Sequence, residues 1–229
     1  MSIITIIPAR GGSKGLPGKN IRNLADLPLI AHSIMSAKEA KLVDKVYVST
    51  DDHEIAEIAK DYGAEIIDRP EQLANDTASS ESALIHAVEQ IEAKDIDINL
   101  VVFLQCTSPI RTAEDIDNAI KKVTTENADS LLSVSPNHRF LWQEVDDVVQ
   151  SINYDYRRRL RRQDMQPQYV ENGSIYIFKP WVLKELNNRL GGKISLFPMS
   201  EAASWEIDSL LDFEIAESLL KKQVKVNAY

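Results

Sequence analysis

Short apolar runs rich in β-branched residues alternate with amphipathic helical patterns along most of this chain. The apolar runs have the length of strands buried on both faces, and the segments between them carry apolar residues at helical spacing. Strands that alternate with helices build parallel sheets, because each helix returns the chain to the starting edge of the sheet. We therefore predict an α/β fold with a mostly parallel sheet flanked by helices. The predicted strands lie at about residues 2–7, 45–49, 64–67, 98–105, 129–135, 174–178 and 194–199.

Three of the intervening segments show the helical period most clearly, at residues 82–93, at 115–123 and onward from about 210. The alternation fails between residues 136 and 169, where aromatic residues and five clustered arginines follow no clear period. A stretch of this length without a regular pattern is a functional excursion or an interaction surface. We predict one domain over residues 1–229 that carries this excursion at about 136–169.

The composition is that of a soluble globular protein, with 44% hydrophobic and 27% charged residues in a chain of 229. No apolar run approaches the roughly eighteen residues of a membrane span, and the N-terminus lacks the pattern of a secretion signal. We therefore expect a cytoplasmic protein without a membrane partner. The net charge of −9 argues against a general nucleic-acid-binding protein, because that class usually presents a basic surface.

The first predicted strand runs directly into a glycine-rich, basic loop. Its glycines let backbone N–H groups approach an anion, and Arg10, Lys14 and Lys19 add positive charge. The loop is not a P-loop, since Ser13 and Asn20 stand where that pattern needs Gly and Ser or Thr. Its glycines, spaced by three, also fail the dinucleotide-binding pattern. We predict that the loop binds phosphate by another arrangement, with a flexible basic surface turn as the alternative.

Read together with motifs further along, this loop resembles the signature of the N-acylneuraminate cytidylyltransferases, also called CMP-sialic acid synthetases. The ordered set of motifs covers nearly the whole chain and is more specific than any single motif. The matching segments are residues 7–15, 19–20, 48–51, 68–70, 73–80, 104–111, 162–163, 172–177 and 206–208. The resemblance implies a Rossmann-like nucleotidyltransferase fold. It also implies transfer of CMP from CTP to the anomeric hydroxyl of an N-acylneuraminate, with release of pyrophosphate.

Other readings stay open at this point. The acceptor can be another 2-keto-3-deoxy sugar acid, such as legionaminate, pseudaminate or an eight-carbon acid. A lysine that some sialic acid enzymes carry near Trp142 is absent here, which leaves the acceptor unassigned. Nothing local encodes cytosine, and a protein that binds a nucleotide without turnover is the non-catalytic alternative. The resemblance further implies a homodimer in which the excursion of one subunit helps to close the active site of the other.

The resemblance implies nucleotide contacts from the loop and from the segment that follows the third predicted strand. The expected loop contacts are Arg10, Gly11, Gly12, Ser13, Lys14, Lys19 and Asn20. Arg10 offers a planar fork for phosphate oxygens, whereas a lysine acts as a point charge, and Lys19 is expected to stabilise the departing pyrophosphate. Arg69 and Ser80 are the expected cytidine contacts, although a serine at a helix start also fits a cap.

The metal and acceptor sites are expected further along the chain. Glu206 and Asp208 are separated by one residue, so in an extended segment both carboxylates point to one face and reach one Mg²⁺. Relatives in the resembling family generally carry Asp at the first of these places, so Asp208 is the safer ligand. With Arg10 and Lys19, it completes the expected catalytic set.

For the acceptor, the resemblance implies contacts from Gln105, Arg162 and the turn at Asn172 and Gly173. An acidic sugar brings a carboxylate, and an arginine suits a carboxylate because its guanidinium forms two parallel hydrogen bonds.

Overall fold

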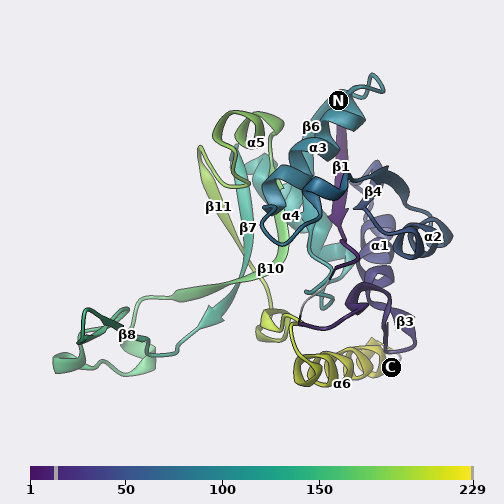
Figure 1. The fold of residues 1–229 in the computed structure, drawn as a ribbon. Coiled ribbons are helices and arrows are strands. Elements are labelled where there is room, and N and C mark those ends of the chain that lie inside the picture. Colours follow the sequence, from purple (N-terminus) through teal and green to yellow (C-terminus); the bar gives the residue numbers. More distant parts are fainter. Residues whose placement is uncertain (13–14, 228–229) are drawn as a thin grey trace.

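The computed structural model describes residues 1–12 and 15–227, and its central sheet confirms the predicted α/β fold (Figure 1). The described strands of this sheet are arranged in the order β11-β7-β10-β6-β1-β4-β5. Neighbouring strands are parallel except at β10, which runs antiparallel to both β6 and β7. The strands are β1 (Ser2–Pro8), β4 (Lys45–Thr50), β5 (Glu65–Asp68), β6 (Ile98–Leu104), β7 (Ser130–Asn137), β10 (Gln168–Phe178) and β11 (Ile194–Pro198).

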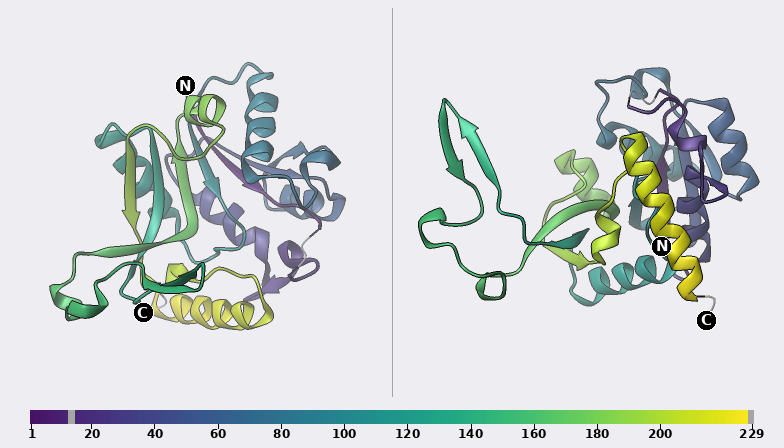
Figure 2. Two further views of the ribbon diagram at one scale, coloured as in Figure 1. Left: turned by 60° about the vertical axis from the view of Figure 1, so that its left-hand side comes forward. Right: turned by 90° about the horizontal axis from the view of Figure 1, so that it is seen from below.

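Helices cover both faces of the sheet (Figures 1 and 2). One face packs against α1 (Leu29–Glu39), α2 (His53–Asp61) and α4 (Ala113–Thr125). The other packs against α3 (Ser80–Glu92) and α5 (Pro180–Leu186). None of the helices in the described part of the chain has the length and apolar character needed to cross a bilayer.

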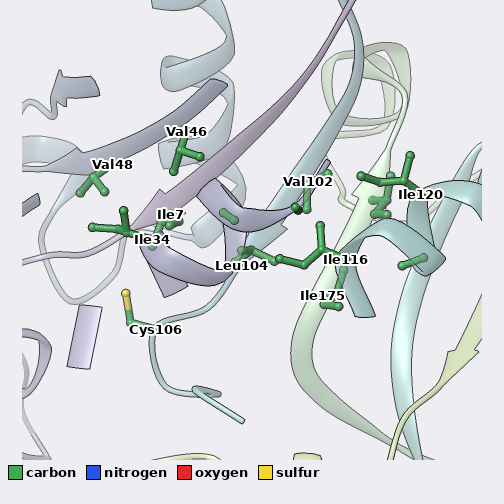
Figure 3. Packing of buried hydrophobic residues seen from close by; sticks show 14 of the residues in the cluster. Ile7, Ile34, Val46, Val48, Val102, Leu104, Cys106, Ile116, Ile120 and Ile175 are labelled. Atoms are coloured by element: carbon green, nitrogen blue, oxygen red, sulfur yellow. The ribbon is translucent and has the colours of Figure 1, made fainter. Parts of the chain in front are cut away.

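Side chains alternate between the two faces along each central strand, because successive residues of a strand point in opposite directions. In β6, Val102 and Leu104 pack on the α1 side, and Val101 and Phe103 pack on the α3 side. Figure 3 shows the α1 side, where Cys106 joins the edge of the apolar core. Burial raises the pKa of the Cys106 thiol to about 12, so this cysteine is an unreactive core residue.

A long projection, which we call the arm, leaves the body between β7 and β10 (Figures 1 and 2). It spans residues 138–167 and occupies most of the predicted excursion. Its main element is an antiparallel hairpin of β8 (Trp142–Val145) and β9 (Val148–Ser151). Two short 3-10 turns follow, η3 (Tyr156–Arg158) and η4 (Arg162–Asp164). The hairpin was not predicted.

A third apolar cluster lies beneath the sheet and joins the two ends of the chain. It packs the first residues of α6 (Leu210–Asn227) against the small hairpin of β2 (Asn23–Leu24) and β3 (Leu27–Pro28). The buried members are Leu16, Leu24, Leu29, Ile207, Phe213 and Ala216. Short 3-10 turns at η1 (Lys19–Ile21), η2 (Glu71–Leu73) and η5 (Glu201–Ser204) complete the described elements.

Candidate active site

A cavity of about 340 Å³ opens at the carboxyl ends of β1 and β6. Open α/β sheets bind ligands in this position, because neighbouring parallel strands deliver their following loops to the same edge. Six of the residues that the sequence predicts for the site line this cavity. They are Arg10, Lys19, Asn20, Ser80, Gln105 and Asp208.

Lys19 and Asp208 lie in direct contact although they are far apart in the sequence. The Lys19 Nζ donates to the carbonyl oxygen of Ile207 at 2.6 Å and lies 3.2 Å from Asp208 Oδ1. The lysine side chain is 11% exposed and the Asp208 side chain 76%, so the carboxylate faces the open part of the cavity. The structure therefore brings the glycine-rich loop and the C-terminal acidic pair to one place.

Apolar packing explains why these two segments meet. Leu16, from the loop, and Ile207, from the acidic segment, are both buried in the third apolar cluster. A Cβ on Gly15 would lie 2.8 Å from the carbonyl oxygen of Asp208, so a larger residue would push the segments apart. The Ile207 amide also donates to the carbonyl of Thr107 at 2.8 Å, which ties the acidic segment to the loop after β6.

Arg10 crosses from the loop to the turn before α3. Its Nη1 donates to the carbonyl of Asn75 at 2.9 Å and lies 3.4 Å from Asp76 Oδ1. Asn20 is buried and holds the loop from the other side, because its Nδ2 donates to the Arg10 carbonyl at 3.1 Å. The Asn20 amide thus fixes the backbone of the loop, while the guanidinium of Arg10 lines the cavity.

The two predicted glycine contacts differ in their surroundings. The Gly11 amide donates to Asp51 Oδ1 at 3.1 Å, and a Cβ on Gly11 would lie 2.5 Å from Asp52 Oδ2. Gly12 is exposed, with open space where a Cβ would stand. The predicted contacts Ser13 and Lys14 lie outside the described residues.

A second cavity of about 290 Å³ adjoins the first and shares its Arg10 and Ser80 walls. Arg69 lines it from a buried position, where its Nε donates to Ser49 Oγ at 3.2 Å. Burial lowers the pKa of Arg69, chiefly by desolvation of the guanidinium. Ser79 caps α3 by accepting from the Ser82 amide at 3.1 Å. Ser80 is therefore not the helix cap, and its side chain lies between the two cavities.

A third cavity of about 530 Å³ lies on the other side of Gln105, and we call it the acceptor-side cavity. Its walls include Gln105, Glu171, Tyr176 and Glu206. Gly173, at a φ of 62°, lies beneath this wall, where a Cβ would overlap the side-chain oxygens of both Gln105 and Glu206. Glycine at this position therefore lets these two side chains meet over the backbone.

The other two predicted acceptor residues lie elsewhere. Asn172 is fully buried, with its Oδ1 accepting from Ser133 Oγ at 2.6 Å and its Nδ2 donating to Ser135 Oγ at 3.1 Å. Its amide therefore holds the turn together and lines no cavity described above. Arg162 is exposed on the arm, where it lines a separate hollow beside Tyr169. Within one chain, the structure does not bring Arg162 to Gln105.

The two predicted metal ligands differ in environment. Burial, with the nearby charges of Asp208 and Glu171, raises the pKa of Glu206 above its ordinary value. Asp208 is exposed and paired with Lys19. Within the described ranges, no three His, Cys, Asp or Glu side chains gather closely enough to hold a metal ion. The chain therefore offers two carboxylates, and a metal would need further oxygens from a ligand such as a triphosphate.

Six residues of the acceptor-side cavity were not predicted from the sequence. They are Glu81, Glu171, Tyr176, Asn188, Arg189 and Leu190. Only Tyr176 could have been found from the sequence. Side chains alternate between the two faces of β10, so Tyr176 faces away from Ile175 and Ile177. Arg189 follows the end of α5 in an irregular segment, where no period shows which way a side chain points.

Comparison with known proteins assigns the chain to a family. The family model described as "Cytidylyltransferase" matches residues 4–228. The chain is 37% identical to Post-translational flagellin modification protein B of Campylobacter coli, over 96% of each chain. It is 35% identical to the CMP-N,N'-diacetyllegionaminic acid synthase of Legionella pneumophila, covering 96% of this chain and 97% of that one.

Identity to the N-acylneuraminate cytidylyltransferase of Oncorhynchus mykiss is 34%, over 94% of this chain. The chain spans about half the length of that relative, 49%. Among solved structures, a CMP:2-keto-3-deoxy-manno-octonic acid synthetase complexed with CTP has the same fold, with a TM-score of 0.74 over 97% of this chain and 100% of that chain. Its sequence identity is 18%. By the family model and these identities, the chain belongs to the cytidylyltransferase family.

Proposed function

We propose that this chain transfers CMP from CTP to the anomeric hydroxyl of an N-acylneuraminate-type sugar acid and releases pyrophosphate. The observation that carries the proposal is the placement of Arg10, Lys19 and Asp208 around one cavity at the carboxyl ends of β1 and β6. Transfer of a nucleotidyl group depends mainly on neutralising phosphate charge and positioning the reacting groups. Fixed cations beside an exposed carboxylate supply both requirements.

The two adjoining cavities suit the two halves of CTP. In this arrangement the triphosphate occupies the cavity of Lys19, and the cytidine occupies the cavity of Arg69 and Ser80. Arg10 lines both cavities, so its guanidinium lies at the junction. Lys19, fixed by its hydrogen bond to Ile207, stabilises the charge that develops on the departing pyrophosphate.

We propose Mg²⁺ as the cofactor, held by Asp208 and, with a weaker contribution, by Glu206. Two carboxylates suit this ion, since Mg²⁺ is commonly bound by one or two carboxylates together with phosphate oxygens of the substrate. When bound, Mg²⁺ would neutralise charge on the phosphates. Asp208→Asn should raise the Mg²⁺ concentration needed for half-maximal pyrophosphate release, and an unchanged titration would remove Asp208 from the ligand set.

The acceptor, in this proposal, occupies the acceptor-side cavity. Gln105 lines both this cavity and the cavity of Lys19, so it stands where the acceptor hydroxyl meets the α-phosphate. Gly173 leaves room for Gln105 and Glu206 at this junction. The reacting groups are thereby held next to each other, which is a large part of what an enzyme contributes to such a transfer.

We further propose that the protein is a homodimer in the cytoplasm, and that the arm of one subunit reaches the site of the other. Apolar side chains on the hairpin support this, because Trp142, Val148 and Val149 are 48%, 60% and 62% exposed. Exposed apolar groups concentrated on one element mark an interaction site. Arg162 is remote from Gln105 within one chain. In such a dimer, Arg162 of one subunit binds the carboxylate of the sugar acid that occupies the site of the other subunit.

A legionaminate-type acid is the second candidate acceptor. The observation in its favour is that the chain matches a legionaminic acid synthase over 97% of that protein's length. It matches the N-acylneuraminate enzyme of Oncorhynchus mykiss over only about half of the relative, 49%. Pseudaminate and eight-carbon acids complete the set of acceptors to be tested.

The test is pyrophosphate release from each of the four nucleoside triphosphates with a panel of these sugar acids. We expect release with CTP and at least one nine-carbon acid, together with a CMP-sugar product. Binding of CTP without release from any pair of substrates would contradict the proposal and identify a nucleotide-binding protein without this activity. Release with another nucleotide in place of CTP would contradict the assignment of the base.

A further inference from the structure

The acceptor-side cavity carries more charge than its proposed role explains so far. Three carboxylates line it, from Glu81, Glu171 and Glu206, and one cation, from Arg189. Arg189 and Glu81 form an ion pair with Nε and Oε1 2.7 Å apart, and their side chains are only 19% and 16% exposed. The ion pair is therefore a partly buried part of the wall, and its two side chains keep a fixed geometry.

Two aromatic rings hold the Arg189 guanidinium from one side. Its Cζ lies 5.0 Å from the ring centroid of Tyr176 and 5.1 Å from that of Phe103. These rings come from directly paired positions of β10 and β6 and stack with centroids 5.3 Å apart. Guanidinium groups bind aromatic faces in this way, and the contact limits the orientations that the side chain can adopt.

The fixed guanidinium keeps unused hydrogen-bond donors. Its Nε donates to Glu81, but neither Nη donates to any residue in the described part of the chain. Arg189 lines the cavity, so these N–H groups are available to a ligand oxygen. Glu171 stands on the same wall, accepts a hydrogen bond from the Tyr176 hydroxyl and, as a carboxylate, can accept more.

This combination of charged groups excludes the carboxylate end of a sugar acid and suits the end that carries an acylamino group. The charge of Arg189 is already balanced by Glu81, so Glu171 leaves the wall negative and would repel a ligand carboxylate. An acylamino group is neutral and offers one carbonyl acceptor and one N–H donor. Its carbonyl matches the donors of Arg189, and its N–H matches the carboxylate of Glu171.

We infer that Arg189, fixed by Glu81, is a specificity-determining residue that binds the acylamino group of the acceptor, together with Glu171. The inference rests on the proposed function and adds an orientation to it. The acylamino end of the sugar acid enters the acceptor-side cavity, and its carboxylate is directed away from Glu171. Acids without an acylamino group gain nothing from Arg189.

The test compares two acceptors in steady-state kinetics of the full chain. In Arg189→Leu, we expect the KM for an N-acylated nine-carbon acid to rise about tenfold or more, because a hydrogen bond to a charged donor is lost. The KM for CTP and the kinetics with an eight-carbon acid without acylamino groups should change little, by about twofold at most. Arg189→Lys should not restore the acceptor KM, because an ammonium lacks the planar fork.

Lys184→Leu is the matched control, since Lys184 and Glu92 form another ion pair between the regions of α3 and α5. It should leave both KM values unchanged. An unchanged acceptor KM in Arg189→Leu, or an equal rise for the eight-carbon acid, would overturn the inference. Should Arg189→Leu melt below the assay temperature, Glu81→Gln replaces it, with a rise in the same KM expected and no rise contradicting the inference.

An assay of the native protein distinguishes failure of the inference about Arg189 from failure of the proposed function. If it turns over no sugar acid with CTP, the proposed function itself is wrong. If it is active and only the acceptor selectivity of the variants disagrees, the inference about Arg189 alone is wrong.

Discussion

Lys19 is the residue whose charge the proposed chemistry uses most directly. Replacing it in Lys19→Ala should lower the rate of pyrophosphate release about 10²–10³-fold, the typical effect of losing one fixed group that stabilises developing charge. The hydrogen bond to Ile207 is also lost, so the free energy of unfolding should fall by about 1–3 kcal/mol. Kinetics and urea unfolding of the same preparation measure the two effects.

Lys45→Ala is the control for Lys19→Ala. Lys45 pairs with Glu65 at 3.0 Å on the exposed surface of β4 and β5, away from the cavities. Its loss should leave the rate unchanged. Near-native activity of Lys19→Ala would show that this lysine has only a structural role.

The carboxyl of Glu206 makes stability depend on pH. Its pKa is raised by burial and by neighbouring carboxylates, so above its ordinary pKa the folded protein holds this proton more tightly than the unfolded chain does. The stability of the native protein therefore falls as the pH rises above the ordinary pKa of a glutamate, and Glu206→Gln removes that loss. We expect the variant to gain stability relative to the native protein as the pH rises above the ordinary pKa of a glutamate, about 4.3.

Urea midpoints of both proteins, followed as the pH rises above that value, measure the difference. A difference that stays constant with pH would show that the native state does not shift the titration of Glu206.

Among single residues, the sequence predicted several charged groups of the site. It did not predict those whose position is fixed by tertiary packing. The meeting of Lys19 with Asp208 was expected only from the family resemblance, which implies that both act on one nucleotide. Arg189 was not predicted, since its place depends on the stacked rings of Tyr176 and Phe103. The burial of Asn172 was equally hidden, because its partners are serines on a neighbouring strand.

At the scale of elements, the third apolar cluster controls where the acidic segment lies. Ile207→Ala should cost about 2–5 kcal/mol of stability, because Ile207 is fully buried. It should also raise the Mg²⁺ requirement and lower activity, because Asp208 follows directly and loses its fixed position relative to Lys19. Urea unfolding and a metal titration of pyrophosphate release measure these effects.

Ile91→Ala provides the comparison. Ile91 is also fully buried, but it lies in α3 and packs on the face of the sheet that α3 and α5 cover, outside the third apolar cluster. We expect a similar loss of stability without a change in the Mg²⁺ requirement. Equal metal titrations for the two variants would contradict the idea that the third cluster positions Asp208.

The elements that the sequence predicted well are those with two buried faces. The predicted strands at 2–7 and 98–105 agree with β1 (Ser2–Pro8) and β6 (Ile98–Leu104), because both are continuous apolar runs. The predicted strand at 174–178 is only the second half of β10, whose first residues, Gln168–Glu171, are mostly exposed. The hairpin of β8 and β9 was missed because neither of its faces is buried within one chain.

At the scale of the whole molecule, the arm predicts association. Val148→Glu places a charge on the exposed hairpin and should convert a dimer to a species with the mass of one chain in light scattering. Activity should fall with it, because Arg162 no longer reaches a partner's site. Folding should be unaffected, since Val148 is 60% exposed.

Leu186→Glu is the matched change, because Leu186 is 49% exposed but lies at the end of α5. In light scattering, the Leu186→Glu variant should keep the mass of a dimer. A native protein with the mass of one chain at micromolar concentration would contradict the proposed dimer directly.

In the proposed function, the glycine-rich loop and the acidic pair together hold a metal-loaded triphosphate. A crystal structure of the protein with CTP and Mg²⁺ tests it most directly. We expect the triphosphate in the cavity at the ends of β1 and β6, with Lys19 on its phosphate oxygens and the ion on Asp208. Density for the nucleotide outside this cavity, or an ion that touches neither Asp208 nor Glu206, would contradict the account.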